Sequence, residues 1–165
     1  MTYADQPLWQ PSPEAVAEAN MTAFMTRAAA QWDTEFADYQ AFRRWSVTEN
    51  EKFWQTLWEF GGVIASSRGD LVVADKTKLP GARWFPEARL NFAENLLRRR
   101  DDSIAMVFRG EDQVRRTLTF NELYDQVSRL AQALAAAGIN PGDRVGAFMP
   151  NMPETMMAMM ASASL

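Results

Sequence analysis

The 165-residue chain is 47% hydrophobic and 23% charged, a balance typical of soluble globular proteins and unlike that of disordered ones. Its formal net charge of −4 gives no electrostatic reason to expect a nucleic acid or an anionic membrane as a partner. The chain has neither cysteine nor histidine, which excludes disulfides, thiolate nucleophiles, zinc–thiolate sites and imidazole as a general base or metal ligand.

The sequence carries no signal for secretion or membrane insertion. Residues 1–14 lack the basic start and apolar core of a secretory signal peptide. No apolar run is long enough to span a bilayer. We therefore expect a cytoplasmic protein that binds neither a membrane nor a nucleic acid.

The first part of the chain is predicted to be helical. Ser12, Pro13 and Glu14 combine an N-cap, a proline at the first helical position and an acid near the positive end of the helix dipole. We expect this helix to run to about Gln31, and a second helical segment to cover about residues 34–45.

Residues 46–51 contain two overlapping capping boxes, either of which would start a third helix. The pairs are Ser46 with Glu49 and Thr48 with Glu51. The helix carries Phe53, Trp54, Leu57 and Trp58 and ends at Gly61–Gly62. An aromatic stripe at helical spacing is more often a packing face than a cofactor site, so we expect it to pack in a core.

Residues 66–81 are predicted to form a loop with a short strand near 71–73. Asn91, with Glu94 three positions later, predicts a helix that ends at the arginines of 98–100. Three arginines at a helix C-terminus complement the dipole, and the acids at 101–102 neutralise much of their charge. We prefer this interpretation to a phosphate-binding patch.

The next stretch predicts a β-hairpin followed by a helix and a strand. Residues 104–108 and 114–118 are the hairpin strands, joined by a turn at 109–112. Thr119 and Glu122 form a capping box that starts an amphipathic helix, and Gly138 ends it. After a turn at 141–143, the apolar run Val145–Met149 predicts a short buried strand.

The last predicted helix has an unusually apolar surface. Asn151 is its expected N-cap, with Glu154 at the third position. Four methionines follow with almost no polar face: Met156, Met157, Met159 and Met160. We expect further polypeptide to bury all four, and therefore expect the isolated chain to be marginally stable or to self-associate through this helix.

Three motifs resemble the adenylate-forming (AMP-binding) acid–CoA ligases. They are TFNEL at 119–123, GINPGDRV at 138–145 and MPNMPE at 149–154. Each alone is weak, since the second is ordinary turn-to-strand chemistry, but three in this order across one helix, turn and strand are a strong signal.

Earlier motifs are similar to those of the acetoacetyl-CoA synthetase branch of that superfamily. These motifs are PLWQPS at 7–12, WSV at 45–47 with FW at 53–54, and WFPEARLNFAENLL at 84–97. Acetyl- and propionyl-CoA synthetases share part of this pattern. One departure is Glu87, which stands where the resemblance implies glycine and is expected only to stiffen a loop.

The resemblance implies an incomplete α/β fold. A helical N-terminal region, residues 1–100, would precede the first hairpin–helix–strand–helix units of an adenylate-forming domain, residues 101–165. Members of this family join a carboxylic acid to CoA through an acyl-adenylate, using ATP, Mg²⁺ and CoA.

The motifs that would carry this chemistry are missing from the sequence. It has no Ser/Thr/Gly-rich phosphate loop ending in lysine, and no GxGxxG or GxxxxGK pattern. No catalytic, cofactor-binding or metal-binding residue is therefore transferred onto this chain. We expect an inactive N-terminal scaffold that binds no cofactor alone and whose partner is the remainder of the same enzyme.

Two alternatives remain open at this stage. One is a fragment of the acetyl- or propionyl-CoA synthetase type. The other is a non-catalytic interaction module whose methionine-rich last helix docks in a partner's groove. A Rossmann nucleotide-binding protein is disfavoured because the glycine fingerprint after the first strand is absent.

Overall fold

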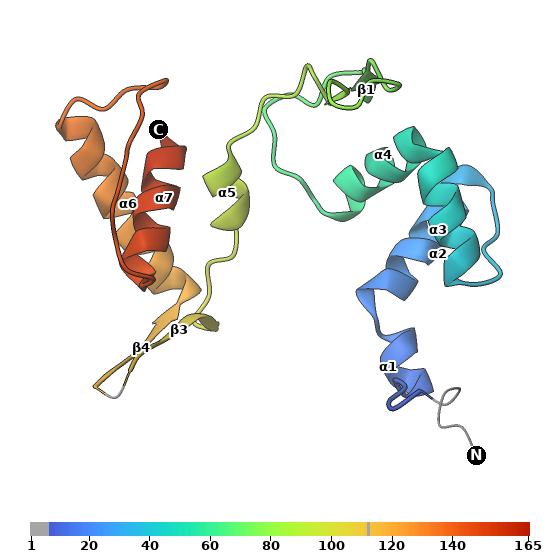
Figure 1. Cartoon of the computed structure of the whole chain (residues 1–165), viewed down its shortest axis with the longest axis horizontal. Coiled ribbons are helices and arrows are strands. Elements are labelled where there is room, and N and C mark those ends of the chain that lie inside the picture. Colours follow the sequence, from blue (N-terminus) through green and yellow to red (C-terminus); the bar gives the residue numbers. More distant parts are fainter. Residues whose placement is uncertain (1–6, 112) are drawn as a thin grey trace. The chain divides into compact units, whose positions relative to one another are not determined.

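A computed structural model describes residues 7–111 and 113–165, and shows two compact units (Figure 1). The first contains the chain up to Val63 together with Arg68–Glu87, and the second contains Ile64–Ser67 together with Ala88–Leu165. The predicted division into residues 1–100 and 101–165 stays a prediction.

The first unit begins with two helices where one was predicted. α1 spans Pro13–Ala17 and α2 spans Asn20–Trp32, because Ala19 between them is extended (φ −68°, ψ 138°). The predicted cap of α1 is confirmed, since the Ser12 side chain accepts a hydrogen bond from the backbone N–H of Ala15.

The capping boxes predicted at residues 46–51 are wrong. α3 spans Tyr39–Thr48, so Ser46 and Thr48 lie inside it, and their hydroxyls donate to backbone carbonyls of the preceding turn. α4 spans Asn50–Phe60, and its N-cap, Glu49, makes no side-chain capping bond. The predicted end of α4 at Gly61 is confirmed.

The predicted packing of the aromatic stripe is confirmed only in part: Phe53 and Leu57 pack against a core, whereas Trp54 is 41% exposed. Phe24 and Phe42 are buried, and Phe53 lies against both. The Phe24 ring meets the rings of Phe42 and Phe53 edge-on at 5.6 Å, a favourable arrangement of aromatic quadrupoles. The buried Thr56 hydroxyl accepts a 2.8 Å hydrogen bond from the indole of Trp32.

A small hairpin completes the first unit. β1 (Val73–Ala74) pairs antiparallel with β2 (Arg83–Trp84), close to the predicted strand at 71–73. Glu87 closes the loop before β1, because its carboxylate accepts hydrogen bonds from the backbone N–H groups of Asp70 (2.9 Å) and Leu71 (3.4 Å).

The second unit contains α5 (Phe92–Leu96), the antiparallel strands β3 (Ile104–Gly110) and β4 (Val114–Thr119), α6 (Phe120–Ala136) and α7 (Pro153–Ser164). Both predicted hairpin strands are confirmed; Asp112, in the predicted turn, lies outside the described residues. The Asn91 side chain caps α5 as predicted, but α5 ends before the arginines of 98–100.

Both ends of α6 match the prediction. The Thr119 side chain accepts from the Glu122 N–H, and the Glu122 carboxylate accepts from the Thr119 N–H. At the other end, Gly138 has a φ of +93°, and two backbone N–H groups bond back to carbonyls of the last turn, Gly138 to Ala135 and Ile139 to Leu134. This is the Schellman arrangement that glycine favours.

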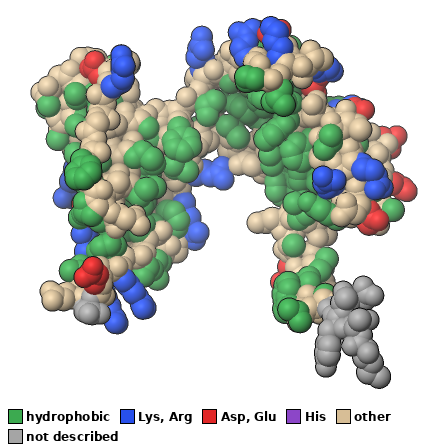
Figure 2. Space-filling view, viewed as in Figure 1, with side chains coloured by type: hydrophobic (Ala, Val, Ile, Leu, Met, Phe, Trp, Pro, Cys, Tyr) green, Lys and Arg blue, Asp and Glu red, His purple; other side chains and the backbone are tan. Residues whose placement is uncertain are grey.

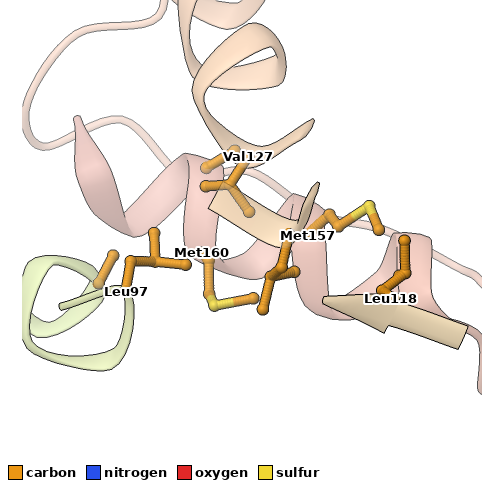
Figure 3. Packing of buried hydrophobic residues seen from close by; sticks show 8 residues of the cluster. Leu97, Leu118, Val127, Met157 and Met160 are labelled. Carbon is orange, nitrogen blue, oxygen red and sulfur yellow. The ribbon is translucent and has the colours of Figure 1, made fainter. Parts of the chain in front are cut away.

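The core of the second unit joins α5, β4, α6 and α7 (Figure 3). Val127 of α6 is 1% exposed and lies among Leu97, Leu118, Met157 and Met160. Two of the four methionines of α7 are therefore buried within the chain itself, which corrects the prediction that further polypeptide covers all four. Met156 and Met159 are 42% and 43% exposed.

Two further predictions in this unit are wrong. Residues 145–149 form no strand and are exposed, because no neighbouring strand among the described residues pairs with them. Asn151 does not cap α7; the N-cap is Met152, which makes no side-chain capping bond. Instead, the Thr155 hydroxyl in the first turn donates to the carbonyl of Pro150.

Candidate functional site

An ion pair ties the β-hairpin to the last helix of the second unit. Arg116 on β4 contacts the carboxylate of Glu154 in the first turn of α7. The hydrogen bond from Arg116, followed by that from the Glu154 backbone N–H, lowers the pKa of Glu154 below its ordinary value. The sequence predicted only a role for Glu154 in capping the start of this helix. The ion pair was missed because its two residues lie 38 positions apart and no local sequence pattern indicates it.

Arg99 and Arg100 are engaged in contacts within the unit. Arg99 pairs with Asp101 at 2.8 Å and lies over the Phe120 ring, and the Arg100 guanidinium lies 3.5 Å from the centre of the Tyr124 ring. Hydrogen bonds from Ser103 and then Arg99 lower the pKa of Asp101 to about 2. These contacts favour the structural interpretation over a phosphate-binding patch.

A bound metal ion would need a cluster of side chains that can ligate it. In residues 7–111 and 113–165, no three acidic side chains gather where a metal ion could be held. In the motif at 138–145, Gly138 ends α6 and Gly142 and Asp143 belong to the turn that follows: both glycines have positive φ, and the Asp143 carboxylate accepts a hydrogen bond from the Asn140 N–H. The acidic side chains of the described residues therefore do not fit Mg²⁺.

What the second unit does offer is an exposed apolar surface on residues 145–159. We call this the C-terminal apolar surface; it comprises Val145, Phe148, Met149, Met156 and Met159. Phe148 is fully exposed, and within the described part of the chain no backbone hydrogen bond is formed by residues 145–149. Exposed apolar side chains that lie together are typical of surfaces that bind other molecules.

The accessible surface of the chain is large for its mass. Figure 2 shows hydrophobic side chains exposed on both units. The chain exposes 12,615 Å². A compact monomer of 18.7 kDa exposes about 8,300 Å², and two separate compact bodies of half that mass about 10,000 Å². The value for the chain is about 2,600 Å² above the second figure.

Comparison with known proteins gives this surface its context. The family model for the acetyl-coenzyme A synthetase N-terminus matches residues 39–96, and that for AMP-binding enzymes matches residues 92–165. An acetoacetyl-coenzyme A synthetase of Rhizobium meliloti (strain 1021) is 50% identical over 162 residues, which is 98% of this chain. The chain belongs to the AMP-binding enzyme family.

Other members of the AMP-binding family are similar over the same length. A malonamoyl-CoA synthetase of Penicillium aethiopicum is 33% identical over 165 residues. The solved structure of an acetoacetyl-CoA synthetase from Streptomyces lividans matches with a TM-score of 0.87 and 40% identity over 96% of the chain, confirming the mixed α/β fold of an N-terminal region.

The chain spans about a quarter of the length of the relatives it matches: 25% of the Rhizobium meliloti enzyme, 22% of the Penicillium aethiopicum enzyme and 25% of the Streptomyces lividans chain. In the described ranges 7–111 and 113–165, no helix is both long and apolar enough to cross a bilayer.

Proposed function

We propose that this chain is the N-terminal portion of an acetoacetyl-CoA synthetase, in which it supplies structural support and no reacting group. The whole enzyme would join acetoacetate to CoA with conversion of ATP to AMP and diphosphate. The observation that carries the proposal is the 50% identity to the Rhizobium meliloti enzyme over 162 residues, which amount to 25% of that protein.

Features of the structure favour a structural role for this chain in the enzyme rather than a catalytic role. Acyl-adenylate chemistry handles polyanions, so it requires cationic or metal groups and phosphate-binding backbone. The chain's own acids and arginines at 99, 101, 116 and 154 are engaged with one another. We propose that ATP, Mg²⁺ and CoA bind to the remainder of the enzyme, and that the isolated chain binds none of them and is inactive.

The names of the relatives point to two acids, acetoacetate and malonamate. Acetoacetate and malonamate differ only by a methyl in place of an amino group beside the second carbonyl. Sequence identity over this region is 33% to the malonamoyl-CoA synthetase and 34% to an acetoacetyl-CoA synthetase of Xenopus tropicalis. This region therefore supports a short acid with a second carbonyl, and the 50% identity favours acetoacetate.

Two further features belong to the same proposal. The C-terminal apolar surface would be covered by the remainder of the enzyme, and in its absence by a second copy of the chain. A reaction that consumes ATP and CoA also supports the cytoplasmic location expected from the sequence.

A chimera tests the proposal. This chain would replace the 162 matched residues of the Rhizobium meliloti enzyme, and diphosphate release would be measured with ATP, Mg²⁺, CoA and either acetoacetate, malonamate, acetate or propionate. We expect turnover by the chimera with acetoacetate as the best substrate, and none by the isolated chain. A folded but inactive chimera would refute the proposed role, and turnover by the isolated chain would refute its inactivity.

A further inference from the structure

The first unit has an apolar pocket that its own side chains leave open. It has a volume of about 340 Å³ and lies between α4 and the β1–β2 hairpin. Its lining consists of Trp54, Leu57, Trp58, Val63, Trp84 and Phe85. None of these side chains carries a charge, and only the indole N–H groups can form hydrogen bonds.

Two aromatic pairs connect the helix side of this pocket to the hairpin side. Trp54 and Trp58 lie one turn apart and so share a face of α4. The Trp84 ring lies 5.7 Å from that of Trp54, and the Phe85 ring lies 4.6 Å from that of Trp58. Two consecutive residues of the hairpin therefore face the same helix.

That arrangement requires an unusual backbone, because successive side chains of a strand point to opposite faces. Phe85 has a φ of +42°, a conformation that a bulky residue rarely adopts, and the following Pro86 restricts it further. The conformation is held by the Phe85 N–H, which donates to the carbonyl of Val72 at 2.8 Å, and by the Glu87 carboxylate bonded to the loop before β1. The neighbours of Phe85 thus impose a strained backbone that presents its ring to the pocket.

The pocket remains accessible despite these contacts. Trp54 is 41% exposed and Trp84 is 39% exposed. ATP, CoA and a carboxylic acid are polar and anionic, and this lining offers no cation and almost no hydrogen-bond partner to compensate for their desolvation. The chemistry of the pocket therefore suits an aliphatic or thioether group.

We infer that the pocket receives an apolar side chain, leucine, isoleucine or methionine, from the part of the ligase that follows the region matched here. The inference rests on the proposed function, since it takes the occupant from that larger protein. Three quarters of the Rhizobium meliloti enzyme and of the Streptomyces lividans chain lie outside the matched region, which supplies ample polypeptide to reach the pocket. Strain held by neighbouring groups is typical of sites that are preorganised to be filled.

The experiment compares oxidation of individual tryptophans in the isolated chain and in the chimera with the Rhizobium meliloti enzyme. Both proteins would be exposed to hydroxyl radicals beside a free indole standard, and the oxidation at each tryptophan would be read by mass spectrometry. We expect Trp54 and Trp84 to be at least about threefold less oxidised in the chimera, because filling the pocket removes most of their exposed area.

A matched pair of variants tests the pocket itself. Val63→Asp places a charge in the pocket lining, which disfavours an apolar occupant without covering Trp84, and is expected to restore oxidation of Trp84 in the chimera. Val47→Asp, at a position of α3 that is 67% exposed and does not line the pocket, is expected to leave Trp84 protected. Hydrogen-exchange protection of the α2 and α4 amides would verify that both variants remain folded.

The outcomes separate this inference from the proposed function. Equal oxidation of Trp54 and Trp84 in the two proteins would overturn the inference, even if the chimera released diphosphate. Protection that appears in the isolated chain and grows with concentration would also overturn it, by showing a second copy as the occupant. Protection in an inactive chimera would support the inference while refuting the proposed function.

Discussion

Replacing single methionines of α7 tests which of them stabilise the second unit. Met157 is 4% exposed and packs in the core with Val127, whereas its neighbour Met156 is 42% exposed. Truncating a buried methionine to alanine costs about 2–5 kcal/mol, the sum of lost transfer energy and the cavity left behind. Truncating an exposed one changes stability by no more than about 0.5 kcal/mol. Methionine and alanine are both good helix formers, so helix propensity contributes little to the difference in stability between the two variants.

The assay must report on the second unit alone. All six tryptophans lie at or before residue 84, in the first unit, so indole fluorescence cannot follow α7. Hydrogen exchange of the α6 amides, which α7 covers, is the direct measurement. We expect Met157→Ala to accelerate this exchange by at least about 30-fold, the equivalent of 2 kcal/mol, unless global unfolding sets a lower limit.

Met156→Ala is the matched control and should leave the exchange rates of α6 unchanged. Equal acceleration by the two variants would refute the assignment of Met157 to the core. An effect of Met156→Ala alone would show that α7 is rotated about its axis relative to the structure described here.

Three further predictions concern local features. Thr119→Ala removes the acceptor for the first turn of α6 and should lower stability by about 1 kcal/mol, measured by denaturant unfolding followed by circular dichroism. The pKa of Glu154 is lowered in the folded chain, so its pairing with Arg116 stabilises the fold above the unfolded pKa of about 4.5, and this contribution disappears as the pH falls through the folded pKa. Because both side chains are more than one-third exposed, Glu154→Gln should lower stability by less than about 1 kcal/mol at pH 7. The same substitution should flatten the acid limb of a plot of stability against pH. Gly69→Ala should destabilise the first unit by more than about 1 kcal/mol, because Gly69 has a φ of +74° and a Cβ there would lie 2.4 Å from the Cβ of Glu87. The loss of stability would be measured from the midpoint of unfolding followed by tryptophan fluorescence. An unchanged midpoint would contradict this account.

The ends of several helices could be predicted from the sequence because the interactions that form them are local. Ser12, Asn91 and Thr119 each bond to a backbone N–H three positions later, and Gly138 follows the helix it ends. These contacts involve residues within a few positions of each other, so the sequence alone contains the information.

The same rule failed at Ser46 and Thr48, where two patterns were compatible with the same residues. A hydroxyl can cap a helix or, from inside one, donate to a carbonyl of the preceding turn. The helix begun earlier at Tyr39 extends through both residues, and tertiary packing of Phe42 in the aromatic core favours that extension. The local motif could not reveal this competition.

Features that depend on distant partners were beyond local sequence reasoning. Residues 145–149 have the composition of a buried strand, but a strand exists only with a neighbour to pair with, and the described residues supply none. The ion pair of Arg116 with Glu154 and the burial of Met157 and Met160 depend on how α7 lies against β4 and α6. The absence of catalytic residues was predicted from missing motifs and stays a prediction.

The contact between Glu87 and Gly69 also restricts how this sequence can vary. While position 87 carries a side chain, the space above residue 69 is occupied, so a substitution at 69 meets both a steric barrier and an unfavourable backbone. A homologue with glycine at 87 would face only the second barrier. The effect of a mutation at one position therefore depends on the other, and stabilising designs that exchange residues between relatives should change the two together.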